Sequence, residues 1–361
     1  MKKRILFIAL AVVLALSVGI IGCNGGQQEE EEEEEEEEPG VIELKCAHTV
    51  PPVEATAGAW IEWGDMIEEE WAAIKGDDEP ELNFTYYWSM SLLMAHEMYD
   101  GVEAGTADIG FYPIGVNPGL LPMNEVARLC FLFSSMDEAL CVGEEMYEGE
   151  ETLFVDEIEG DGAVKFLTWY MMGPYQLHMA TDDVTLPADL AGRPIGAESE
   201  ILDIITAAGG TAVETTFATV AESLDLGTIE GNIIHMPAQF ACGGLDFTTS
   251  HTNIGTAGVA IVPAVFIMNP DSWDSLPSDL QALIVSKLPE FAAGQQGALF
   301  GSAAYFTGIA VDRGDTFIDL TEPQIDEWRA LAVSQHEDWR AQSAAHDDAY
   351  NLVQSFIANC Q

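Results

Sequence analysis

The chain has 361 residues, with 12 lysines and arginines against 62 aspartates and glutamates, so its formal net charge is −50 at pH 7. A surface this negative repels nucleic acid and anionic membrane faces, which argues against both as binding partners. The acidic residues are spread along the whole chain. This spread favours adaptation to a salty or acidic environment over a cationic ligand as the reason for the charge. Hydrophobic residues make up 48% of the sequence, as expected of a packed protein.

The first 23 residues carry the pattern of an exported lipoprotein. Basic residues at positions 2–4 precede an apolar run over 5–21, and Gly22 and Cys23 follow. This order predicts a signal peptide over residues 1–22, cleavage before Cys23 and acylation of that cysteine. A membrane-spanning helix is the alternative, but the run is close to the lower length limit for a span. We therefore expect an extracytoplasmic protein, periplasmic or on the outer cell surface, attached to a membrane through Cys23.

Ten consecutive glutamates at 29–38 follow the cysteine. Like charges repel and bury no apolar surface, so residues 23–40 are predicted to form a disordered tether. The remaining residues, 41–361, are enough for two lobes with separate cores.

Strands and helices alternate in the first part of the globular region. Hydrophobic periodicity predicts strands over 42–46, 82–88 and 107–112, with helices over 60–74 and 92–104 between them. This order predicts a largely parallel sheet that is covered on both faces. Ligands of such sheets bind beyond the carboxyl ends of the strands, which makes Trp88, Ser89, Met90 and Tyr112 candidate pocket residues.

The second part is predicted from residue 163 onward. Strands are expected over 163–170 and 176–180, followed by a βαβα unit over 189–231 and a short strand at 232–236. We expect the chain to return to the first lobe near 251–261. A long helical tail is expected to begin at 266–269, with its main helix from about residue 278 to 306.

No catalytic motif, metal motif or cofactor motif is present in the sequence. The patterns GxSxG, GxxxxGK[ST] and GxGxxG are absent, and HEMYD at 96–100 lacks the second histidine of a zinc-protease helix. Beyond Cys23 there are five cysteines with no CxxC spacing, so at least one has no partner within the chain. Their pairing is open: Cys46, Cys130, Cys141, Cys242 and Cys360.

Five phrases occur in the order typical of the solute-binding proteins of TRAP transporters. They are WSMSLLMAHEMYDGVEAGTADIG, LCFLF, LPADLAGRPIG, LDLGTIEG and NPDSWDSLPSDLQALI, and together they extend over most of the chain after Val41. The resemblance implies an α/β fold of the two-lobed, type II-like periplasmic-binding-protein class, with a long C-terminal helix that bridges the lobes. It implies lobe I over 41–170 with part of 255–300, and lobe II over 171–254 with part of 300–361.

The resemblance also implies a function. The chain would capture a small organic molecule by lobe closure and deliver it to the membrane subunits of a TRAP permease, without enzymatic activity or a cofactor. Two alternatives stay open: a sensor that presents its ligand to a receptor kinase, and a secreted enzyme on the same scaffold.

The sequence departs from the family pattern where the family usually grips a carboxylate. The phrase usually ends in an arginine, and here that position is Gly196. Arg193 does not replace it, because residues three apart on a strand point to opposite faces. We expect a neutral, aromatic or cationic solute, or an anion held by Lys165, Arg128 or a metal.

The ligand contacts that the resemblance implies form a set of nine residues: Trp88, Tyr112, Trp169, Tyr175, Gly196, Glu198, Phe217, Asn232 and His235.

Overall fold

The computed structural model describes residues 40–360. The predicted signal peptide, Cys23 and the predicted tether up to residue 39 lie outside the described residues. Within residues 40–360, no helix is both long and apolar enough to cross a membrane.

Five strands form the first sheet, in the order β2-β1-β3-β10-β4. They are β1 (Val41–Ala47), β2 (Glu81–Tyr87), β3 (Ile109–Pro113), β4 (Lys165–Met172) and β10 (Val262–Met268). Strand β1 pairs in parallel with β2 and β3, whereas β10 runs antiparallel to both β3 and β4. The predicted parallel arrangement is correct for the first three strands, and β10 returns from the second half of the chain to complete the sheet.

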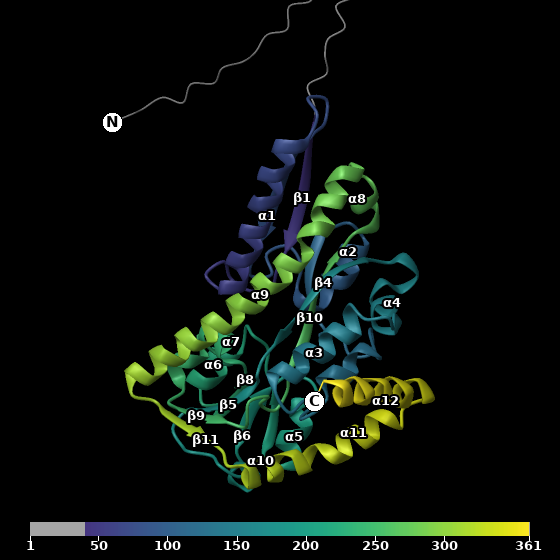
Figure 1. The fold of residues 1–361 in the computed structure, drawn as a ribbon. Helices are drawn as coiled ribbons and strands as arrows, with labels where there is room; N and C mark the ends of the chain where they lie inside the picture. Colours follow the sequence, from purple (N-terminus) through teal and green to yellow (C-terminus); the bar gives the residue numbers. More distant parts are fainter. Residues whose placement is uncertain (1–39, 361) are drawn as a thin grey trace, which may run out of the picture. The chain divides into compact units, whose positions relative to one another are not determined.

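Helices cover both faces of this sheet (Figure 1). They are α1 (Ala55–Ile74), α2 (Met98–Glu103), α3 (Met136–Tyr147), α4 (Leu153–Glu159), α8 (Pro270–Asp274), α9 (Ser278–Arg313) and α12 (Ala344–Asn359). Neighbouring residues of β10 belong to opposite cores: Phe266 packs with Trp60 of α1, and Val265 with Val142 of α3. This alternation explains why β10 is hydrophobic along its whole length, because neither face meets water.

The second sheet has six strands in the order β11-β9-β5-β8-β6-β7. They are β5 (Gln176–Met179), β6 (Pro194–Ala197), β7 (Thr211–Glu214), β8 (Gly231–Ile234), β9 (Ser250–Asn253) and β11 (Thr316–Asp319). Its helices are α5 (Ile201–Ala207), α6 (Val220–Asp225), α7 (Met236–Ala241) and α10 (Glu322–Arg329). Helix α11 (Val333–Arg340) follows them and packs on α12, and its Trp339 belongs to a core of the first sheet. The predicted βαβα unit is present as β6-α5-β7-α6, and a separate hydrophobic core lies beneath this sheet.

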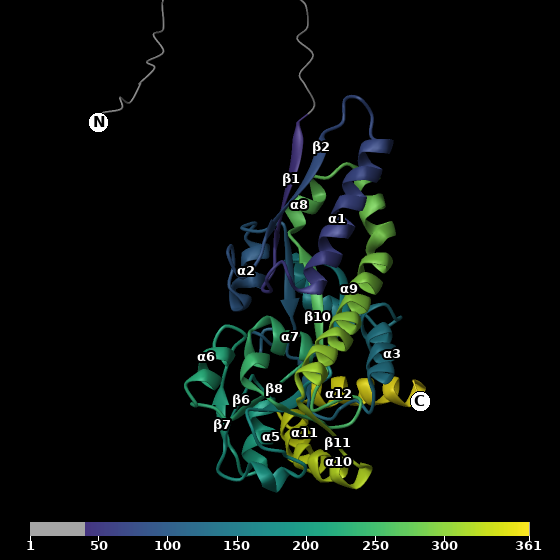
Figure 2. The same ribbon diagram turned by 90° about the vertical axis from the view of Figure 1, so that its left-hand side faces the viewer.

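Three connections join the two sheets. The chain passes from β4 to β5 through residues 173–175 and returns from β9 to β10 through residues 254–261. The third connection is α9, whose 36 residues span about 54 Å at 1.5 Å per residue. Figures 1 and 2 both show α9 running from beside α1 to the start of β11. The predicted long helix that bridges the lobes is therefore present.

Two predicted boundaries are wrong in informative ways. Residues 266–268 end strand β10 and do not begin the helical tail, because their side chains fill the cores on both faces of the first sheet. Residues 251–253 still belong to the second sheet as part of β9, so the return crossing starts at residue 254.

A disulfide joins Cys141 of α3 to Cys360, which caps the end of α12. Among residues 40–360, Cys46, Cys130 and Cys242 are free thiols. The bridge holds the C-terminal helix against the first lobe, in which α12 packs on α3.

Candidate functional site

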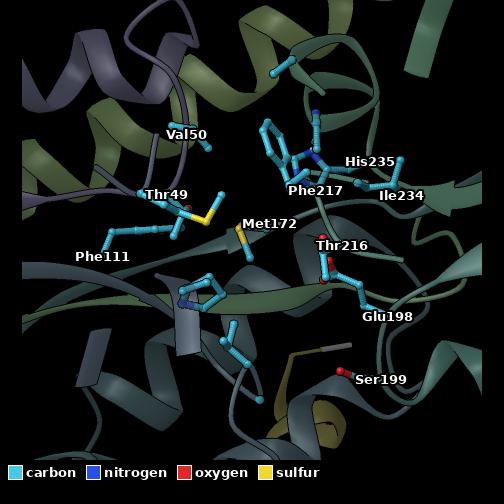
Figure 3. A pocket seen from close by; sticks show the side chains of 18 of the residues that line it. Thr49, Val50, Phe111, Met172, Glu198, Ser199, Thr216, Phe217, Ile234 and His235 are labelled. Atoms are coloured by element: carbon cyan, nitrogen blue, oxygen red, sulfur yellow. Dashed lines mark hydrogen bonds between the residues drawn. The ribbon is translucent and has the colours of Figure 1, made fainter. Parts of the chain in front are cut away.

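A cavity of about 310 Å³ lies where the carboxyl ends of strands from the two sheets face each other. Segments that follow β1, β2 and β3 line it from the first sheet, and segments that follow β6, β7 and β8 line it from the second. Figure 3 shows these two groups of side chains on opposite sides of the cavity: Thr49, Val50 and Phe111 on one side, and Glu198, Ile234 and His235 on the other. The position agrees with the rule that ligands of open α/β sheets bind beyond the carboxyl ends of the strands.

Four of the nine predicted site residues line this cavity: Tyr175, Glu198, Phe217 and His235. His235 is buried, and burial lowers its pKa to about 4, so its imidazole is neutral at pH 7. Its Nδ1 accepts a hydrogen bond from the backbone amide of Ala238 and so caps the start of α7. The ring of Tyr175 lies edge-on to His235, with 5.2 Å between the ring centroids.

Two predicted aromatic contacts lie on the wrong face of their strands. Tyr112 of β3 is fully buried in the core on the face opposite the cavity, and its neighbour Phe111 lines the cavity instead. Trp169 of β4 is buried in that same core, where its Nε1 donates to Oε1 of Glu148 at 2.8 Å. Its neighbour Tyr170 faces the cavity. Because side chains alternate along a strand, an error of one residue moves a side chain to the other face.

Trp88 also lies outside the cavity lining. Its ring stacks on Tyr86, with 5.3 Å between centroids, in the cluster that contains Trp60. The next two residues, Ser89 and Met90, both have positive φ angles, near 57° and 59°. These two left-handed residues turn the chain sharply. Of the three candidates in this segment, Met90 lines the cavity as predicted, whereas Trp88 and Ser89 do not.

Gly196 does not line the cavity, and the space beside it is occupied. A Cβ atom at this position would lie 2.8 Å from Cδ1 of Ile229 and 2.9 Å from Oγ1 of Thr215. Thr215 itself lines the cavity. Position 196, where the resemblance implies an arginine in the family, therefore lacks room for a side chain.

Asn232 is buried on β8, where its Nδ2 donates to Oε1 of Gln239 at 2.7 Å. Gln239 continues this buried network to Thr248. The side chain of Asn232 is thus engaged within the second lobe, and it does not line the cavity.

Arg128 places a permanent positive charge at the cavity wall, but the carboxylate of Glu200 compensates that charge. Its Nε donates to Oε2 of Glu200 at 2.9 Å, and its Nη1 donates to the carbonyl oxygen of Ile114. Burial acts to lower the pKa of Arg128, but the combined effects of Glu200, Tyr175 and Glu198 outweigh burial, so the pKa is raised. Gly115, with a φ of +80°, leaves room for this side chain, since a Cβ there would collide with it.

Lys165 and Arg193, the other basic residues considered for an anion, do not reach the cavity lining. Lys165 lies over the ring of Trp273, 4.7 Å from its centroid. Arg193 pairs with Glu230 at 2.7 Å and with Asp182 at 3.0 Å on the surface of the second lobe. Residues 40–360 contain no group of three or more His, Cys, Asp or Glu side chains placed to hold a metal ion.

Glu54 is a cavity residue that the sequence analysis missed. It follows the carboxyl end of β1 and is the N-cap of α1, where its Oε2 accepts from the backbone amide of Thr56 at 2.9 Å. The rule that selected Trp88 and Tyr112 also applies to the segment after β1, so the signal that could have found Glu54 was present.

The comparison with known families settles the class of protein. Residues 47–342 match the profile of the family described as bacterial extracellular solute-binding protein, family 7 (DctP). The chain belongs to this family.

Solved structures share the fold of this solute-binding protein at low sequence identity. A TRAP solute-binding protein from Rhodoferax ferrireducens, in complex with copurified benzoate, matches with a TM-score of 0.78 and 19% identity, over 88% of this chain and 98% of that one. A marine metagenome protein specific for aromatic acid ligands, in complex with 3-hydroxybenzoate, matches with a TM-score of 0.78 and 20% identity, over 89% and 99%. A Bordetella pertussis receptor that binds pyroglutamic acid matches with a TM-score of 0.73 and 16% identity, over 86% and 99%.

Proposed function

We propose that this protein captures a small organic solute in the cavity between its two lobes and delivers it to the membrane subunits of a TRAP permease, without chemical change. The observation that carries the proposal is the cavity lined by strand ends from both sheets. We propose lobe I over 41–170 with part of 255–300, and lobe II over 171–254 with part of 300–361. The two separate sheets support a division into two lobes, although β4 extends to Met172, two residues past the proposed end of lobe I.

Capture would work by closure of the two lobes about their three connections. A solute that contacts both cavity walls stabilises the closed arrangement more than the open one, and this difference in affinity drives closure. Delivery then requires that the permease recognise the closed form. An extracytoplasmic location and a lipid anchor at Cys23 would place the protein at the membrane that carries its permease.

The proposed solute is neutral, aromatic or cationic. The structural neighbours named above hold carboxylates, whereas this chain has Gly196 where the resembled family has its carboxylate-binding arginine. The loss of a bidentate arginine removes charge-assisted hydrogen bonds of roughly 1.5–3 kcal/mol each. A carboxylate would therefore bind at least about tenfold more weakly, at 1.4 kcal/mol per factor of ten.

Native mass spectrometry of the purified full-length protein tests this function, because it weighs the protein together with any solute that it retains. We expect one small organic molecule per chain, released on unfolding. A tightly held simple dicarboxylate, with no metal present, would contradict the proposed solute class.

A pair of variants tests the site. Phe217→Ala removes an aromatic side chain from the cavity wall, and burial of a phenylalanine contributes about 1.5–3 kcal/mol, so the affinity for the retained solute should fall about ten- to hundredfold. Phe247→Ala is the matched control, because Phe247 is more than a third exposed and lies outside the cavity lining. Equal losses in both variants would place the solute elsewhere.

A further inference from the structure

Glu54 lines the cavity and carries a buried carboxylate oxygen without a hydrogen-bond partner among residues 40–360. The residue is 6% exposed, and its Oε2 is engaged by the amide and the hydroxyl of Thr56 at the start of α1. Its Oε1 is buried and accepts no hydrogen bond from any of residues 40–360. A buried carboxylate oxygen without a donor is costly, so this atom requires a donor that the protein does not supply.

Glu198 brings a second carboxylate from the opposite lobe. It follows β6, lines the cavity and is open to it, although protein surrounds it on the other sides. This enclosure raises the pKa of Glu198, against the opposing effects of Arg128 and of the backbone amide of Phe217. Burial raises the pKa of Glu54 in the same way. Both carboxylates would therefore gain from a positive partner.

The remaining charges at the cavity do not meet this need. Arg128 already donates to Glu200 and to Ile114, and His235 is neutral at pH 7 because burial lowers its pKa to about 4. Glu214 adds a further acidic side chain to the lining. The cavity lining thus contains more carboxylates than permanently positive side chains.

Aromatic rings form much of the remaining wall. Phe111, Tyr170, Tyr175 and Phe217 all line the cavity. The faces of aromatic rings attract cations, and ammonium groups are commonly held by such rings together with carboxylates.

We propose that the solute is an organic cation, with an ammonium group on an apolar or aromatic body, and that its N–H groups donate to Oε1 of Glu54 in one lobe and to the carboxylate of Glu198 in the other. This inference rests on the proposed solute capture and narrows it to one class of ligand. Contact with carboxylates of both lobes also couples binding to closure, because only the closed arrangement lets one ammonium group meet both.

Three probes of nearly equal shape test the charge: 2-phenylethylamine, 2-phenylethanol and phenylacetate. Titration calorimetry with the full-length protein should show the amine binding at least tenfold more tightly than the other two. A preference for phenylacetate or 2-phenylethanol would overturn the cation proposal but leave solute capture in place. If none of the three binds and no solute is retained in native mass spectrometry, both proposals fail.

Variants separate the two carboxylates from the overall charge of the chain. Glu54→Gln and Glu198→Gln should each weaken binding of 2-phenylethylamine at least tenfold, whereas Glu144→Gln, on the exposed face of α3, should leave it unchanged. Because the glutamine at 54 keeps an oxygen that can cap α1, that variant is expected to fold. Unchanged affinity in both cavity variants would refute the proposal.

Proton linkage gives an independent readout. The groups that face Glu198 include Arg128, Glu214 and Tyr175, and Glu54 faces Tyr170. Burial raises the pKa of both carboxyls, and a carboxyl that holds a proton must release it when an ammonium group binds. As the pH is lowered, the heat of binding should therefore come to depend on the ionisation enthalpy of the buffer in the direction of proton release. Proton uptake on binding would contradict an ammonium at these carboxylates.

Discussion

Adding one methyl group at Gly196 is expected to destabilise the protein. A Cβ there would lie 2.8 Å from Cδ1 of Ile229 and 2.9 Å from Oγ1 of Thr215, closer than packed atoms normally approach. Ile229 can move its terminal carbon, but Thr215 is buried and β-branched, so it is stiff at χ1. Overpacking costs about 1–3 kcal/mol, and the usual gain from replacing glycine by alanine offsets about 0.4–1 kcal/mol. We expect Gly196→Ala to lower the free energy of unfolding by about 1–2 kcal/mol.

Urea unfolding followed by tryptophan fluorescence measures this change, with Gly297→Ala as the control. Gly297 is exposed within α9, and nothing lies within 4 Å of a Cβ built there. Alanine in a helix interior is favoured over glycine by roughly 0.5–1 kcal/mol, so the control should shift stability in the opposite direction. Combining Gly196→Ala with Ile229→Val, which removes the nearest carbon atom, should cost less than the sum of the two single changes.

A Gly196→Ala variant as stable as the wild type, or two glycine variants that shift stability in the same direction, would contradict overpacking at position 196. An arginine at 196 would meet the same atoms of Thr215 and Ile229. We therefore expect that Gly196→Arg alone would not create a carboxylate site.

Three further predictions concern charge and covalent linkage. Burial lowers the pKa of His48 to about 3, below its unfolded value near 6.5, so its contribution to stability is complete above pH 6.5 and is lost as the pH falls; by pH 5 the loss is about 2 kcal/mol. Urea titrations at pH 7 and pH 5 should show that His48→Gln loses about 2 kcal/mol less unfolding free energy between these pH values than the wild type does. An equal loss in both proteins would contradict a buried, neutral His48. Replacing both Cys141 and Cys360 by serine removes a bridge between residues 219 positions apart, and it should lower the free energy of unfolding by up to roughly 5 kcal/mol. The midpoint of urea unfolding measures this change. An unchanged midpoint would show that the bridge does not restrict the unfolded chain. Glu200→Gln leaves Arg128 without its anionic partner, which should lower the free energy of unfolding by roughly 2–4 kcal/mol. The unpaired guanidinium should also strengthen phenylacetate binding at least tenfold, as measured by calorimetry. A stable variant with unchanged affinity would show that the Arg128–Glu200 pair does not neutralise the charge at the site.

The periodic parts of the sequence predicted the elements well. Buried Trp60, Trp63, Ile67 and Trp71 recur at the spacing that predicted α1, and the glycine-bounded unit after residue 189 forms β6, α5, β7 and α6. These patterns are local, because a helix or strand shows one face to a core wherever that core lies. The end of β10 was mistaken for the start of a helix because a strand buried on both faces shows no alternation.

The candidate site was predicted only in part, for a reason visible in two pairs of neighbours. Phe111 and Tyr170 line the cavity where Tyr112 and Trp169 were expected, whereas Met90, which was also expected there, does line it. All four aromatic residues are hydrophobic, so composition does not tell which neighbour faces the cavity. Strand pairing decides which face of the sheet each side chain occupies.

The sequence by itself indicated a two-lobed α/β solute-binding protein through phrases in a fixed order that resemble TRAP solute-binding proteins, and local periodicity indicated most of the helices and strands. The same resemblance placed Gly196 where that family usually has an arginine. Only the tertiary structure decided that Thr215 and Ile229 occupy the space beside Gly196, that Arg128 is matched by Glu200, and that Glu54 shares a cavity with Glu198. Glu54 and Glu198 are 144 residues apart in the numbering, and only the folding of two sheets toward each other brings them to one site.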